Sequence, residues 1–279
     1  LVEVSDATVT ISDNPTISQL NAIAAKTTGV VTATLAADSL SNLGSLSTAG
    51  TDVITVTVND TTGTGVTAAN LSALGGKTAG VVTVTNALAI TGDHDQLTAA
   101  LVTTDTKVVA STSTVTINDA DGTAITASEL SAIGGATSAT VTVTNAVAIT
   151  GDHDQVTAAL VTDDTKVSVS DATVTINDVD ATAITAAELS AIGDATTGTV
   201  TVTNAAAITG TAAEVTAALV TAESLNEVTN PAVTITGNPT IAQLNNIAAK
   251  TTGVVTATLA ADSLSNLGSL TTAGTDVIT

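Results

Sequence analysis

The sequence predicts an α/β fold, a tandem-repeat solenoid of parallel strands and short helices. The first observation is internal repetition, because a fixed period of this length is typical of stacked supersecondary units. A strand-like Val-Thr-Val-Asn-Asp motif and its variants stand at residues 9–13, 56–60, 115–119, 174–178 and 233–237, and the last four copies are 59 positions apart. The second observation is that each 59-residue unit holds two coils, where a coil is a strand, a turn, a short Ala-rich helix and a return.

The motif divides the chain into repeating units. These units are residues 9–55, 56–114, 115–173, 174–232 and 233–279. A larger cycle is also present, because residues 23–55 reappear 224 positions later as 247–279 with one change, from Ser47 to Thr271, and the cycle restarts at Leu225. We therefore predict one continuous solenoid over residues 1–279.

The third unit illustrates the predicted elements. Its first coil has a strand at 115–117 and a helix near 126–133, and its second coil has a strand at 140–144 and a helix near 152–160. Alternation of Thr with Val or Ile indicates strands with one buried face, so we expect Val and Ile inside and Thr outside. Connections that contain a helix predict parallel strands, stacked at about 4.8 Å.

A capping pattern marks the predicted start of each helix. In this pattern a Ser, Thr or Asp is followed three residues later by Glu or Gln, and the two residues satisfy each other's free backbone N–H groups. It occurs as Thr16/Gln19, Asp93/Gln96, Thr126/Glu129, Asp152/Gln155, Thr185/Glu188, Thr211/Glu214 and Thr240/Gln243. We expect the helices to end near Gly134, Gly135 and Gly193.

The composition favours architecture over chemistry. The chain has no Phe, Trp, Tyr, Met, Cys or Arg, so its core must consist of small aliphatic side chains, which build few ligand pockets. Its formal net charge of −21 repels phosphate backbones, so we expect no nucleic-acid partner. The sequence also has no apolar stretch long enough for a membrane span. We therefore predict that the chain has no small-molecule substrate and no enzymatic activity. An enzymatic activity would require a catalytic domain outside these residues.

The most site-like string is Thr-Gly-Asp-His-Asp-Gln at residues 91–96 and 150–155. A histidine between two carboxylates could indicate a metal site or an acid–base pair. The third copy, Thr-Gly-Thr-Ala-Ala-Glu at 209–214, loses the histidine and both aspartates but keeps the capping pattern. We therefore interpret Asp93, Asp152 and Thr211 as helix caps, together with Thr126 and Thr185, rather than as sites.

A candidate calcium turn contains Asn118, Asp119 and Asp121. Oxygen ligands at alternate positions, followed by Gly122, resemble the start of a calcium loop. The copy at 177–181 lacks the Gly and the copy at 59–63 lacks the second Asp. Turn formation by side-chain-to-backbone bonds is the favoured interpretation and weak calcium binding is the alternative, with no other cofactor expected.

Rows of Thr on the outward strand faces offer a second function. They include Thr83, Thr85, Thr140, Thr142, Thr201 and Thr203. Such rows can reflect β-propensity alone, but they also fit sheet-to-sheet association, an adhesin shaft or an ice-binding face.

The repeats resemble those of the giant cell-surface proteins of marine cyanobacteria, a family that includes a protein linked to swimming motility. The likeness lies in repeat style over the whole chain, for example Ile-Thr-Gly-Thr-Ala-Ala-Glu-Val at 208–215 and Thr-Thr-Gly-Val-Val-Thr-Ala at 27–33. This resemblance implies an extracellular, very long, calcium-associated surface protein.

These observations lead to one functional prediction. We expect a structural repeat region of an extracellular filament, surface layer or stalk, in which coils stack end to end and the partner is the chain itself. Both ends carry alternating strand-like sequence, at residues 1–4 and 276–279, without a residue that would block an open edge. We therefore expect each end to pack against another copy or a continuation, as in a protein fibril.

Overall fold

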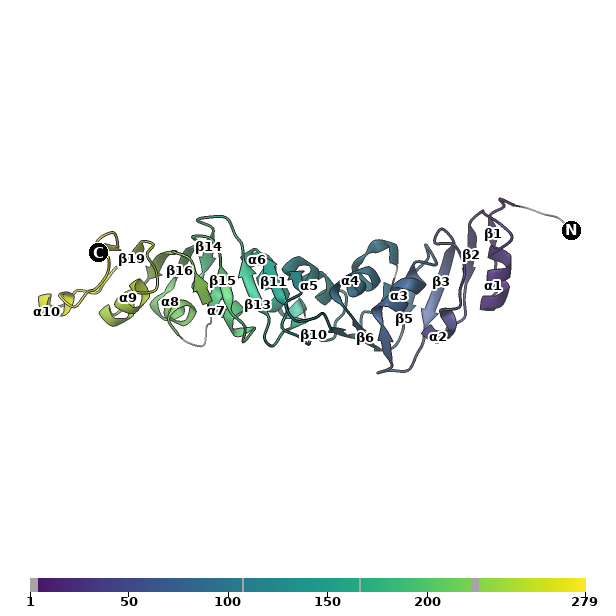
Figure 1. Ribbon diagram of the computed structural model, residues 1–279, viewed down its shortest axis with the longest axis horizontal. Coiled ribbons are helices and arrows are strands. Elements are labelled where there is room, and N and C mark those ends of the chain that lie inside the picture. Colours follow the sequence, from purple (N-terminus) through teal and green to yellow (C-terminus); the bar gives the residue numbers. More distant parts are fainter. Residues whose placement is uncertain (1–4, 107, 166, 222–225) are drawn as a thin grey trace. The chain divides into compact units, whose positions relative to one another are not determined.

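The computed structural model describes residues 5–106, 108–165, 167–221 and 226–279 (Figure 1). The fold is α/β, with four sheets of parallel strands and short helices between the strands. Two compact units are present, Leu1–Asp119 with Glu129–Thr144 and Asp164–Val167, and Ala120–Ser128 with Asn145–Asp163 and Ser168–Thr279. They interleave along the sequence, so their limits do not follow the 59-residue repeats.

The first unit contains two five-stranded sheets. One has the order β1 (Val9–Thr10), β2 (Val31–Thr34), β3 (Val53–Val58), β5 (Val82–Val84) and β7 (Val108–Val109), and the first four of these strands are labelled in Figure 1. The other has the order β4 (Gly65–Thr67), β6 (Ala89–Gly92), β8 (Thr114–Ile117), β10 (Val141–Val143) and β12 (Val167–Ser168). Its helices are α1 (Ile17–Ala24), α2 (Leu40–Leu43), α3 (Ala68–Gly75) and α4 (His94–Leu97), and its shorter turns are η1 (Thr98–Val102), η2 (Thr104–Thr106) and η3 (Asp163–Thr165). Helix α5 (Ala127–Gly134), turn η3 and strand β12 each have residues in both units.

The second unit also contains two five-stranded sheets. One has the order β9 (Ala124–Thr126), β11 (Ala148–Gly151), β13 (Thr173–Ile176), β15 (Val200–Val202) and β17 (Asn226–Val228). The other has the order β14 (Ala183–Thr185), β16 (Ala207–Thr211), β18 (Ala232–Thr236), β19 (Val255–Ala257) and β20 (Val277–Ile278). Its helices are α6 (His153–Leu160), α7 (Ala186–Asp194), α8 (Ala212–Leu219), α9 (Ile241–Ala248) and α10 (Leu264–Leu267).

Strand pairing follows the repeat period. Every pairing between the described strands is parallel, which confirms the prediction. Val115 pairs with Val141, and 59 positions later Val174 pairs with Val200 in the same register. Each strand of the sheet that starts at β9 begins 59 positions after a strand of the sheet that starts at β4. Like side chains therefore stack on like side chains from coil to coil.

Aliphatic side chains fill the space between the sheets and the helices. Val115, Ile117, Val141 and Leu130 are each at most 1% exposed, as predicted for the inward faces. Burying such a side chain contributes about 1.5–3 kcal/mol. Successive helices also pack against one another, α7 against α8 and α8 against α9. Uniform small side chains suit this arrangement because each coil meets an almost identical neighbour.

Two helices end close to the predicted glycines. Helix α5 ends at Gly134, and α7 runs through Gly193 and ends at Asp194. Glycine is needed at Gly134 for close packing rather than for a left-handed turn, because a Cβ there would collide with the carbonyl oxygen of Thr165.

Strands β1 and β20 each lie at one edge of their sheet, and among the described strands β20 pairs with β19 alone. The strand predicted at residues 1–4 lies outside the described residues. In the part of the chain that the structure describes, no helix is both long enough and apolar enough to cross a bilayer.

Candidate functional site: side chains that join successive coils

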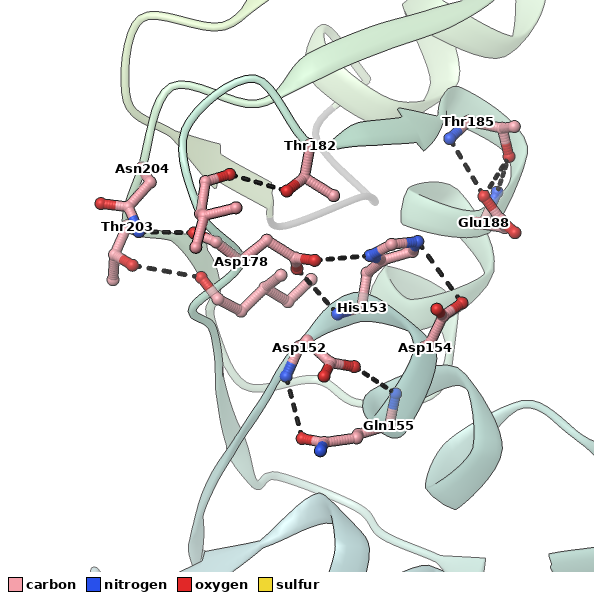
Figure 2. A network of polar contacts seen from close by, with 12 residues as sticks. Asp152, His153, Asp154, Gln155, Asp178, Thr182, Thr185, Glu188, Thr203 and Asn204 are labelled. Atoms are coloured by element: carbon pink, nitrogen blue, oxygen red, sulfur yellow. Dashed lines mark hydrogen bonds and ion pairs between the residues drawn. The ribbon is translucent and has the colours of Figure 1, made fainter.

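The predicted caps stand at the helix starts. Asp152 Oδ1 accepts a hydrogen bond from the backbone N–H of Gln155 at 2.8 Å, and Gln155 Oε1 accepts one from the backbone N–H of Asp152 at 3.1 Å (Figure 2). The same reciprocal arrangement occurs at Thr185 and Thr211. Asp93 Oδ1 accepts a hydrogen bond from the backbone N–H of Gln96 at 2.8 Å. Thr126 directly precedes α5. These side chains stabilise the first turn of each helix, typically by about 1 kcal/mol per cap.

A histidine and an aspartate join neighbouring coils in the second unit. His153 is the first residue of α6, and Asp178 lies just after β13, the strand beside the one that leads into α6. Asp178 Oδ1 lies 2.8 Å from His153 Nδ1, and Asp178 Oδ2 accepts the backbone N–H of His153 at 2.8 Å (Figure 2). One carboxylate therefore holds both the ring and the helix N-terminus of the preceding coil.

The first unit contains the equivalent pair. His94 Nδ1 lies 2.7 Å from Asp119 Oδ1, and the amide of His94 donates to Asp119 Oδ2 at 2.8 Å. The side chains of His94 and Asp119 are only 14% and 5% exposed. In the third repeat both partners are replaced together, by Ala212 and Gly237. We call His94–Asp119 and His153–Asp178 the His–Asp pairs.

The surroundings of the His–Asp pairs are acidic. Partial burial lowers the pKa of His153, but the hydrogen bond and charge of Asp178, with the charges of Asp154 and Glu188, outweigh this and raise the pKa above its ordinary value. His153 Nε2 lies 3.5 Å from Asp154 Oδ1. The pKa of His94 is raised for the same reasons, by Asp119, Asp95 and Glu129. The neighbouring carboxylates therefore stabilise the protonated, positively charged form of both imidazole rings.

The candidate calcium residues take part in contacts between coils. Both carboxylate oxygens of Asp119 accept from His94. Asp121 Oδ1 accepts a hydrogen bond from the backbone N–H of Ala146 at 3.1 Å. Asn118 is exposed, and its backbone N–H donates to the carbonyl oxygen of Gly92 at 3.0 Å. Among the described residues, no group of three or more His, Asp or Glu side chains is arranged to hold a metal ion.

A buried threonine provides a further contact between coils that the sequence analysis missed. Thr196 Oγ1 donates to the carbonyl of Ala172 at 2.6 Å and accepts the amide of Gly198 at 3.0 Å. The equivalent residues are Thr27, Thr78, Thr137 and Thr251. The signal was a Thr two residues before a Gly or Ala, ahead of the strand that follows each of these five threonines, but Thr is so common in this chain that the pattern does not stand out.

Two matching hollows, within residues 14–45 and 238–269, partly overlap the duplicated segments. Their acidic residues are Asp38 and Asp262, and each accepts two hydrogen bonds within its own turn, from the next backbone amide and from Asn42 or Asn266. Neither hollow contains a nucleophile beside a base. The polar side chains described above therefore cap helices or join coils.

The comparisons with known proteins gave no match. No family model matches the chain, and no curated protein or solved structure matches it.

Proposed function

We propose that this chain is a non-enzymatic structural repeat region of an extracellular filament, surface layer or stalk, built as a solenoid. One observation carries the proposal. The side chains best suited to catalysis or ligand binding, such as the histidines and aspartates, instead join one coil to the next, at positions that recur every 59 residues. Each added coil then buries the apolar side of the coil before it, which favours length. The extracellular location rests on the resemblance of the repeats to cyanobacterial surface proteins.

The test is to lengthen the chain within its own period. Two further copies of residues 115–173 inserted after residue 173 supply four coils, so at about 4.8 Å per strand a solenoid lengthens by about 19 Å. Small-angle scattering should show this increase in the longest dimension with an unchanged cross-section. An increase in cross-section without added length would overturn the proposal. The measurement is made at low protein concentration to avoid self-association.

A second candidate is a binding face for ice or for another surface, as in an adhesin shaft. The observation that favours it is the alignment of Thr side chains across strands, since Thr126, Thr150, Thr175 and Thr201 pair in register along one sheet. An ice-binding face requires such regular rows of hydroxyl and methyl groups. Replacing Thr175 and Thr201 with Lys should abolish thermal hysteresis, and a wild-type chain without hysteresis would remove this ice-binding role.

A further inference from the structure

Exposed valines form a diagonal stripe across the first sheet of the first unit. Val30, Val53, Val81 and Val109 are 36%, 41%, 49% and 48% exposed. They lie on, or directly before, the neighbouring strands β2, β3, β5 and β7. In the register of the sheet, each valine stands two positions further along its strand than the valine of the preceding strand, so the four are diagonal neighbours on the outward face. We call these four residues the valine stripe.

The fold does not require valine at these positions. In the following repeat, 59 positions later, the counterparts of Val53, Val81 and Val109 are polar and exposed, namely Thr112, Thr140 and Ser168. The coils stack there without the valines, so their presence in the first sheet has no reason within the coil.

The exposed aliphatic residues are concentrated rather than scattered. Eight large aliphatic side chains are exposed in the described part of the chain, and four of them form the valine stripe. Two more, Val254 and Val277, are the counterparts of Val30 and Val53 in the duplicated segment. Single exposed aliphatic residues are ordinary, whereas a contiguous and recurring set indicates a contact surface.

The face that carries the valine stripe is uncharged. On the described strands β1, β2, β3, β5 and β7, every residue of the outward face is Val or Thr. Strands β2, β3 and β5 are each paired on both sides, so a missing neighbouring strand is not the reason that their valines are exposed.

We propose that this face packs, sheet on sheet, against the same face of a second copy of the chain through the valine stripe. The inference rests on the proposed function, because it gives a structural repeat region side-to-side contacts. Two sheets pack face to face at about 10 Å, a distance at which side chains from both faces interdigitate. The same surface is used by both copies, so the contact is a symmetric dimer contact.

Charge and area identify the second copy as the occupant. The chain carries a formal net charge of −21, so two copies approach with least repulsion through a face without carboxylates. The five strands span about 24 Å at about 4.8 Å each, and the six residues of β3 span about 20 Å. Two such faces bury about 1,000 Å² in total, which is the lower limit of a specific interface. We therefore expect a weak, concentration-dependent association.

Net charge also gives the association a distinctive salt dependence. Near 1 M salt the screening length falls to about 3 Å, and the repulsion between the two acidic chains is largely removed. The apolar contact between valines persists under these conditions. Association should therefore strengthen as salt is added.

The experiment measures self-association of the 279-residue chain by sedimentation velocity, over a wide concentration range and from low to high salt. The wild type should associate with rising concentration and salt. Val81→Asp should weaken association about tenfold or more, because a carboxylate would lose its hydration in the contact, whereas Val179→Asp should not. Val179 is the matched control because it is 77% exposed in a turn of the second unit and receives the same charge change.

A second variant removes the valines without adding charge. Val53→Thr, Val81→Thr and Val109→Ser together introduce the residues that the following repeat carries, so folding, checked by circular dichroism, should be unchanged. This variant should also lose association at high salt. If it associates as the wild type does, the valine stripe is not the contact and the inference is wrong.

A mixing experiment tests whether the contact is symmetric. Because each copy uses the same face, a fluorescently labelled Val81→Asp chain should not enter the species formed by the wild type. Its entry at the wild-type level, a wild type that stays monomeric throughout, or an equal loss in Val179→Asp overturns the inference. Lengthening by the inserted repeats is measured on dilute chains and would still support the solenoid, so the two proposals fail separately.

Discussion

The His–Asp pair in the second unit predicts a pH-dependent coupling between two coils. The perturbation is a double-mutant cycle of His153→Ala and Asp178→Ala. Their contact, 2.8 Å between Nδ1 and Oδ1, is a charge-assisted hydrogen bond when the ring is protonated, and such bonds contribute about 1.5–3 kcal/mol. The side chains are 13% and 7% exposed, so screening is modest and we expect a coupling energy of about 1.5 kcal/mol at acidic pH.

The sign of the pH dependence follows from the raised pKa of His153. A pKa that is higher in the folded than in the unfolded chain adds stability that is fully present below the ordinary value, about 6.5 for histidine, and is lost as pH rises through the folded value. The coupling should be smaller in alkaline buffer, where only a hydrogen bond from the neutral ring to the carboxylate remains. Glu188 makes the opposite contribution to the pH dependence of stability. Hydrogen bonds from Thr185 lower its pKa, so its contribution is lost as the pH falls rather than as it rises. Measurements above about pH 5 keep it ionised.

The assay uses two readouts. Urea unfolding followed by far-ultraviolet circular dichroism gives the coupling energy, since the chain has no aromatic residue for fluorescence. Proton NMR titrates the two imidazoles directly, and the His153→Ala variant assigns the remaining signal to His94. A coupling energy that is constant or grows with pH would refute the reasoning, as would a His153 that titrates at or below its ordinary pKa.

Three further pairs of substitutions test the packing and the turns by chemical denaturation. Ala181→Gly should raise the free energy of unfolding by about 0.5–1 kcal/mol, and Gly122→Ala should lower it by a similar amount. The reason is that these equivalent residues have left-handed φ angles of +63° and +76°. Changes of the same sign in the two variants would contradict this. Thr196→Val should cost about 1–3 kcal/mol by leaving a buried carbonyl of the preceding coil without its donor, and Thr196→Ser should restore most of the loss. Leu40→Ala should cost about 2–5 kcal/mol, whereas Leu264→Ala in dilute solution should change stability by less than about 0.5 kcal/mol. Similar losses at the two leucines would show that burial does not separate the two copies.

Much of the fold could be predicted from local and periodic signals. Strand alternation, as at residues 115–117, requires only that one face be buried and the other exposed. A capping residue such as Asp152 acts within one helical turn, so its role is encoded over three positions. Parallel pairing followed from the helix between successive strands.

The contacts between coils were harder to predict. The third copy of the motif, at residues 209–214, keeps the capping pattern and so correctly indicated helix capping at Asp152. It did not reveal the contact of His153 with Asp178, because the residues that replace them in that repeat, Ala212 and Gly237, lie in different motifs. Asp119 was grouped with its sequence neighbours in a calcium turn, whereas its carboxylate contacts a histidine on the preceding coil. Sequence spacing alone does not show which residues the stacking brings together.

By itself the sequence determined the period, the alternation of strand and helix, the aliphatic core and the helix starts, because each depends on interactions within one coil or on the burial of one face. Only the tertiary structure decided which strands share a sheet, which carboxylates and hydroxyls join one coil to the next, and which of two nearly identical leucines is buried. The physical reason is that these properties depend on the neighbouring coil. The same residues, as at Leu40 and Leu264, are core or surface according to whether that neighbour is present.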